Sequence, residues 1–149
     1  MFKMQIENIF IKSAVLIFLS ICTVFDIRKK EIPFILAGMG MAAAVVFTIW
    51  RIGNGSIFAA QILQSLLPGL FFLLTGWCTK EKVGYGDGIL LLITGLVVGF
   101  HQCFTGLCIG LFLSAIFGVL LLLLHKAQKN SRIPFVPFMM MGMGVSFIL

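Results

Sequence analysis

Long apolar segments separated by short, charged loops form the dominant pattern along the chain. An α-helix needs about 20 residues, most of them apolar, to cross the hydrocarbon core of a membrane. Segments near that length predict helices at about 9–25, 33–50 and 57–77, two within 88–124 that are separated at 101–104, and one at about 134–149. The fourth and sixth are short, which tilt or a partly sunken end would accommodate. We therefore predict one domain over residues 1–149, an all-α membrane protein built as a polytopic bundle of about six transmembrane helices.

The composition supports this class. Hydrophobic residues make up 60% of the chain and charged residues 11%, and the mean hydropathy is +1.14. Soluble domains contain about 45–50% apolar and about 25% charged residues. An ordinary soluble domain is therefore excluded, and membrane lipid is the expected surrounding of the helices.

The net charge of +6 comes from basic residues that gather in loops. Three loops, after the first, third and fifth predicted helices, hold eight of the eleven Lys and Arg residues: Arg28, Lys29, Lys30, Lys80, Lys82, Lys126, Lys129 and Arg132. These loops share one side of the membrane, and Lys and Arg concentrate in cytoplasmic loops. We therefore predict that the N-terminus lies outside and that these loops face the cytoplasm. A nucleic-acid partner is not expected, because the chain has no continuous basic face.

Glycines and cysteines receive structural interpretations. Gly95-x-x-x-Gly99 and Gly106-x-x-x-Gly110 predict close packing of the fourth helix on the fifth. We expect this pairing within the chain, and the oligomeric state is left open. The cysteines form no C-x-x-C pair and have no histidine cluster beside them, so we expect no zinc or other metal and interpret them as small packing residues. They are Cys22, Cys78, Cys103 and Cys108.

The two aspartates of the chain, Asp26 and Asp87, both fall at the predicted cytoplasmic ends of helices. Asp26 closes the first helix, and Asp87 opens the fourth. Taken separately, Asp26 could be the first solvated residue of a charged loop, and Asp87 could cap the start of a helix. Taken together, they can meet in space if the first and fourth helices are neighbours.

A pair of carboxyl groups at this depth favours a chemical role. Ionisable groups in membrane segments are costly and tend to be functional. Two carboxyls held close together share a proton and titrate as a unit. The ionised one can take a proton from water, while the protonated one supports the developing oxyanion and the leaving amine. This chemistry is aspartic proteolysis, which needs no metal or cofactor.

Three motifs, in matching order along the chain, resemble one family of membrane proteases. GYGD at 84–87 resembles the G-x-G-D motif of polytopic membrane aspartyl proteases. DIRKKEIP at 26–33 resembles the first-aspartate motif of the type IV prepilin peptidases. IPFVPFMMMG at 133–142 is similar to the segment that opens the last helix of that family.

The resemblance implies an endopeptidase in the plasma (inner) membrane of a prokaryote, with its active site facing the cytoplasm. Such an enzyme removes the short, basic leader from type IV prepilins and pilin-like proteins. Carried over by position, Asp26 and Asp87 are the catalytic pair, and Gly84 and Gly86 shape the turn before the second aspartate. The motif positions that support the pair are Gly84, Tyr85, Gly86, Arg28 and Pro33.

The chain departs from the family pattern at several places. Phe34 stands where the family commonly has Asn, and Val136 stands where Gly is common, and both departures bear on substrate fit. Full-length bifunctional relatives carry a methyltransferase segment with paired C-x-x-C motifs, which this sequence does not contain. We therefore expect a minimal, peptidase-only form without N-methyltransferase activity.

Three alternatives remain open. A preflagellin-type leader peptidase is the closest. A small proton-coupled transporter subunit would use the aspartates as proton carriers, but it favours an acid in mid-span, and the second, third, fifth and sixth predicted helices contain neither Asp nor Glu. A catalytically silent scaffold would tolerate replacement of both aspartates.

Overall fold

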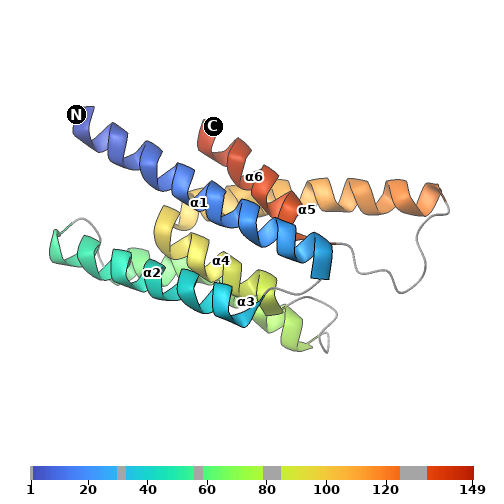
Figure 1. Ribbon diagram of the computed structural model, residues 1–149, viewed down its shortest axis with the longest axis horizontal. Coiled ribbons are helices and arrows are strands. Elements are labelled where there is room, and N and C mark those ends of the chain that lie inside the picture. Colours follow the sequence, from blue (N-terminus) through green and yellow to red (C-terminus); the bar gives the residue numbers. More distant parts are fainter. Residues whose placement is uncertain (1, 30–32, 56–58, 79–84, 125–133) are drawn as a thin grey trace.

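The computed structural model describes residues 2–29, 33–55, 59–78, 85–124 and 134–149 (Figure 1). These ranges form the helices α1 (Phe2–Lys29), α2 (Phe34–Gly53), α3 (Ala59–Cys78), α4 (Tyr85–Val98), α5 (Phe100–Leu123) and α6 (Val136–Ile148). They contain no strand, and α1, α2, α3 and α5 are long and apolar enough to cross a membrane. The predicted all-α membrane bundle is therefore confirmed. α4 and α6 are shorter, at 14 and 13 residues.

The boundary between the fourth and fifth helices differs from the prediction. α4 and α5 meet on either side of Gly99, so the predicted break at 101–104 is wrong and that segment lies within the start of α5. Gly99 has a φ of +89°, a conformation that residues with a Cβ rarely adopt. Its N–H donates to the carbonyl of Gly95 at 2.8 Å, and its own carbonyl accepts the N–H of Cys103 at 3.1 Å. One glycine thus ends α4 and begins α5.

The two short helices supply much of the buried core. Successive helices run back and forth, so the ends of α1, α3 and α5 lie toward one end of the bundle with the starts of α2, α4 and α6 (Figure 1). α4 contacts α1, α2, α3 and α5, while α6 packs on α1 and α5. The largest fully buried side chains come mainly from α4 and α6: Leu19, Leu90, Leu91, Met139 and Met143. The long helices expose many large apolar side chains on their outer faces, which suits contact with lipid.

Glycines mark the closest helix contacts, but they pair different helices from those predicted. Gly142 of α6 fits against the backbone of Gly106 and Gly110 of α5, where a Cβ would have no room. Gly95 of α4 fits against the backbone of Ser65 of α3 in the same way. The predicted pairing of α4 with α5 through these glycines is therefore wrong. Gly106 and Gly110 pair α5 with α6, and Gly95 pairs α4 with α3.

Replacing Gly142 by Ala should lower the free energy of unfolding by about 1–3 kcal/mol, because overpacking forces closely packed backbones apart. Gly144→Ala is the matched control in the same helix, since a Cβ at Gly144 meets nothing within 4 Å. Thermal unfolding of the detergent-solubilised protein, followed by circular dichroism, compares the two variants. Equal midpoints for Gly142→Ala and the wild type would contradict the close contact between α5 and α6.

Candidate active site

Asp26 lies in the last two turns of α1 and caps the start of α6. Its side chain is buried, with the residue 8% exposed, and its Oδ2 accepts a hydrogen bond of 3.2 Å from the backbone N–H of Val136. Val136 is the first residue of α6, and the first N–H groups of a helix have no partner within it. The N-cap residue, Phe135, supplies no side-chain acceptor. A carboxyl group from a neighbouring helix therefore takes the place of a local cap.

The other end of α6 also meets a charged side chain of α1. Lys12 donates from Nζ to the carbonyl of Phe147 at 3.3 Å, and Nζ lies 5.4 Å from the centroid of the Phe147 ring. A helix carries partial positive charge at its N-terminus and partial negative charge at its C-terminus. The carboxyl group of Asp26 and the ammonium of Lys12 match these two ends. Together they fix the register of α1 against α6, and with it the depth of Asp26.

Asp87 is the third residue of α4 and is half-buried. The next residue, Gly88, packs so closely on Leu73 of α3 that a Cβ would have no room. The adjacent Phe72 of α3 stacks on Phe135, the residue before α6, with ring centroids 5.4 Å apart. One segment of α3 thus holds the start of α4, which carries one aspartate, and the start of α6, which binds the other.

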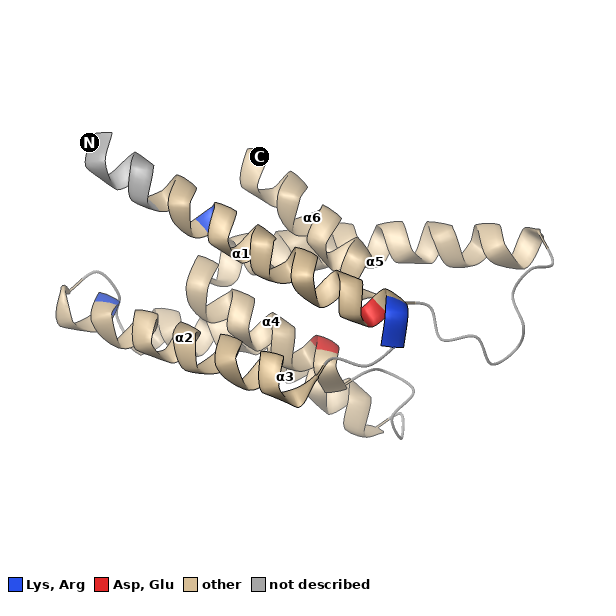
Figure 2. Cartoon of the chain, in the orientation of Figure 1, with Lys and Arg blue, Asp and Glu red and all other residues tan. Residues whose placement is uncertain are grey.

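The two carboxyl groups act on each other electrostatically. Figure 2 shows the acidic positions of α1 and α4 toward the same end of the bundle, and α1 contacts α4. Asp87 lies outside the four candidate membrane spans. Loss of solvation, together with the charge of Asp26, raises the pKa of the Asp87 carboxyl to about 7. The ordinary pKa of an Asp carboxyl is about 3.9. With the raised pKa, a large fraction of the Asp87 carboxyls is still protonated near neutral pH. The structure thus brings the two predicted catalytic aspartates into one site.

The other predicted site residues that the structure describes lie at the ends of helices. Tyr85 and Gly86 are the first two residues of α4. Arg28 is exposed in the last turn of α1, where a cation favours the helix C-terminus. Pro33 is the N-cap of α2, and its carbonyl accepts the first hydrogen bonds of that helix. Gly84 lies outside the described residues. So do the basic loop residues Lys30, Lys80, Lys82, Lys126, Lys129 and Arg132.

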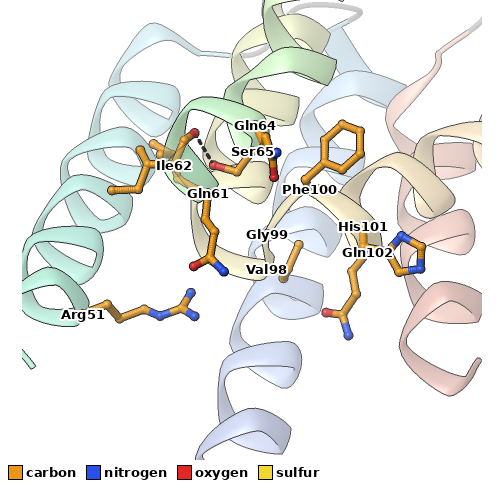
Figure 3. A pocket seen from close by; sticks show the side chains of 11 residues that line it. Arg51, Gln61, Ile62, Gln64, Ser65, Val98, Gly99, Phe100, His101 and Gln102 are labelled. Carbon is orange, nitrogen blue, oxygen red and sulfur yellow. Dashed lines mark hydrogen bonds between the residues drawn. The ribbon is translucent and has the colours of Figure 1, made fainter. Parts of the chain in front are cut away.

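A hollow of about 450 Å³ lies at the other end of the bundle, between the end of α2, the start of α3 and the turn from α4 to α5 (Figure 3). The guanidinium of Arg51 borders it, donates to the carbonyl of Val97 at 3.4 Å and lies 5.7 Å from the ring centroid of Phe47. Arg51 thus places a cation at the C-terminal end of α4, where the helix dipole favours one. The described residues that line the hollow include no Asp or Glu, so it is separate from the carboxyl site.

The contact between Asp26 and α6 is not evident from the motifs of the sequence. The residues that open α6, IPFVPF at 133–138, contain no Ser, Thr, Asp or Asn, which are the usual N-caps. A buried helix start without a local cap needs an acceptor from elsewhere in the chain. The missing cap in the sequence therefore indicates that a distant residue supplies the acceptor, but it does not identify that residue as Asp26.

Comparisons with known proteins agree with the motifs. The model of the type IV leader peptidase family matches residues 13–124. A prepilin leader peptidase/N-methyltransferase of Pseudomonas aeruginosa is 35% identical over 85 residues, which are 57% of this chain and 28% of that protein. A protein of the same name from Stutzerimonas stutzeri is 28% identical over 114 residues, which are 76% of this chain and 37% of that protein. Another from Aeromonas salmonicida is 36% identical over 85 residues, which are 57% of this chain and 28% of that protein. The chain thus spans roughly a third of the length of these relatives. No solved structure matches.

Proposed function

Because the chain belongs to the type IV leader peptidase family, we propose that it is a membrane aspartic endopeptidase that removes the basic leader from type IV prepilins or pilin-like proteins. The observation that carries this proposal is the meeting of Asp26 and Asp87. They come from helices α1 and α4 and are 61 positions apart along the chain, and the charge of Asp26 contributes to the raised pKa of Asp87. A pair of carboxyls whose charges interact in this way is the group that aspartic proteolysis requires.

The reaction follows from the two protonation states of the pair. The ionised carboxylate takes a proton from a water molecule, and the water oxygen forms a bond to the carbonyl carbon of the scissile peptide. The protonated carboxyl donates a hydrogen bond to the carbonyl oxygen as it becomes an oxyanion. When the tetrahedral intermediate collapses, the C–N bond breaks and a carboxyl proton goes to the leaving amine. The products are the leader, with a new carboxyl terminus, and the mature protein, with a new amino terminus.

We place the site at the cytoplasmic face of the plasma (inner) membrane. The ends of α1, α3 and α5 share one end of the bundle (Figure 1). The last turn of α1 and the loops that follow these three helices together hold eight of the eleven basic residues. By the tendency of Lys and Arg to stay in the cytoplasm, that end is inside and the N-terminus is outside. A substrate with its leader in the cytoplasm would then reach both aspartates.

We assign peptidase activity alone to these 149 residues. The names of the curated relatives also include N-methyltransferase. The resemblance associates that activity with paired C-x-x-C motifs, and residues 1–149 contain none. A methylation assay on the cleaved product, with a methyl donor present, tests this part of the proposal.

Asp26→Asn and Asp87→Asn should each lower the rate of leader cleavage by at least about a thousandfold, because neither remaining carboxyl can serve as both base and acid. Each variant is co-expressed in membranes with pilin-like substrates, and cleavage is followed by gel shift and by sequencing of the mature N-terminus. Gly144→Ala, which changes a site distant from the pair, is the control and should cleave like the wild type.

The outcomes separate the alternatives. Wild-type cleavage that both aspartate variants retain would contradict the two-carboxyl mechanism. A preflagellin-type leader offered beside a prepilin distinguishes the two kinds of leader peptidase. If neither is cleaved, a proton flux assay in vesicles tests the transporter alternative.

The pH dependence of kcat/KM should show an alkaline limb near pH 7. The raised pKa of Asp87 means that its proton is present below about 7 and is lost as the pH rises through that value. Above it both carboxyls are ionised, no acid remains for the leaving amine, and the rate falls about tenfold per pH unit. Initial rates at low substrate concentration measure this limb for the free enzyme. A rate that stays constant from pH 6 to pH 9 would contradict a shared proton.

A further inference from the structure

We infer that the first N–H of α6 assigns unequal roles to the two aspartates, holding Asp26 ionised as the base that activates water and leaving the proton on Asp87. Val136 is then a positioning residue that acts through its backbone and not through its side chain. The inference rests on the proposed function, because it concerns the same pair of carboxyls. It goes beyond that function by distinguishing two residues that the motifs alone treat as equivalent.

The geometry at Asp26 favours the carboxylate. Its Oδ2 accepts the N–H of Val136 at 3.2 Å, and a hydrogen bond to the charged form favours that form. Bonds from N–H groups to carboxylates are roughly twice as strong as those between neutral groups. Oδ2 also lies at the N-terminus of α6, where the helix dipole stabilises negative charge. Phe135 offers no side-chain cap, so the N-cap residue does not compete with Asp26 for this N–H.

Asp87 experiences a different balance of forces. It lies in the first turn of α4, which by itself would favour ionisation. Loss of solvation and the like charge of Asp26 act in the opposite direction and raise its pKa. An ionised Asp26 therefore makes Asp87 the better place for the shared proton. The two helix starts have similar dipoles, and Asp26 is itself buried. What separates the two aspartates is therefore the bond from Val136 to Asp26.

In the part of the chain that the structure describes, the charged groups around Asp26 do not reverse this assignment. The helices packed on α1 near Asp26 are α6 and α4. The sequence of α6 has no ionisable side chain, and that of α4 has only Tyr85 and Asp87. On α1 itself, the nearby ionisable residues in the described part of the chain are Cys22, Arg28 and Lys29. The two cations are exposed and favour an ionised Asp26, while the Cys22 thiol is neutral near pH 7.

The start of α6 is held firmly enough to serve this purpose. Phe135 stacks on Phe72 of α3 at 5.4 Å, and its carbonyl accepts the N–H groups of Phe138 and Met139, each at 3.0 Å. Val136 itself has no exposed surface. The N–H therefore points at Asp26 from a fixed position and needs no rearrangement when the carboxylate forms.

The test removes this N–H without removing the side chain. Val136→Pro would do so, and proline is tolerated at the first position of a helix. However, proline disfavours the helical conformation of the residue before it, and Phe135 has φ −89° and ψ −30°. The sharper variant replaces Val136 by the corresponding α-hydroxy acid through nonsense suppression, which turns the backbone N–H into an ester oxygen. The same replacement at Phe138 is the matched control, because it deletes a 3.0 Å bond in the same turn that does not involve Asp26.

Two readouts are compared for the wild type and both esters. The first is the acidic limb of the pH profile of cleavage, and the second is the titration of the Asp26 carboxyl carbon by 13C NMR in detergent. The Val136 ester should move the acidic limb and the Asp26 titration upward by about one pH unit and leave the alkaline limb in place. The Phe138 ester should leave all three where the wild type has them.

Several results would overturn the inference. One is a Val136 ester whose acidic limb and Asp26 titration coincide with those of the wild type, and another is a Phe138 ester that shifts them equally. A failure of the proposed function looks different, because the wild type would then cleave no leader or both Asn variants would still cleave. In that case the NMR titration alone still decides whether the N–H of Val136 holds Asp26 ionised.

Discussion

The hydrogen bond from the first N–H of α6 to Asp26 is the contact on which the candidate site depends. α6 has 13 residues and begins in the interior of the bundle with Val136 fully buried. A buried N–H without an acceptor costs about 1–3 kcal/mol, and Asp26 supplies that acceptor at 3.2 Å. The contact also fixes the position of the Asp26 carboxyl. A carboxylate is costly in lipid, and the N-terminus of α6 is the end of that helix whose partial positive charge stabilises it. Lys12 binds the opposite end of α6, so the same helix pair fixes the position of the carboxyl at two points.

Two closely packed helix pairs extend this constraint to the second carboxyl. Gly142, Gly106 and Gly110 bring α6 against α5, while Gly88 and Gly95 bring α4 against α3. The stacking of Phe72 on Phe135 joins the two pairs at the level of the aspartates. Backbones in such close contact cannot shift without a clash, and an active site needs its groups held within fractions of an ångström. The carboxyl site therefore lies where the α3–α4 pair meets the α5–α6 pair, and α1 contacts one helix of each pair.

The sequence predicted the features that depend on composition and local pattern, and it failed where the answer depends on contacts between distant segments. Apolar length predicted the number and type of helices, and the topology placed Asp26 and Asp87 at the same end of the bundle. The helix break at Gly99 was missed because the polar residues at 101–104 gave a stronger pattern than a single glycine whose positive φ is not visible in a sequence. The glycine pairs were assigned to the wrong helices because a small residue signals close packing but does not identify its partner. The bond from Val136 to Asp26 could not be predicted for the same reason.

A comparison of four cleavage rates tests most directly whether the two aspartates act as one unit. The rates are those of the wild type, Asp26→Asn, Asp87→Asn and the double variant, measured on one substrate in the same membranes, with protein amounts matched. Residues that act together lose their contributions together. If the two carboxyls act as one unit, each single variant falls to the same low rate and the double variant falls no further. A double variant slower than either single by the product of their separate losses would contradict it, because the two carboxyls would then act independently.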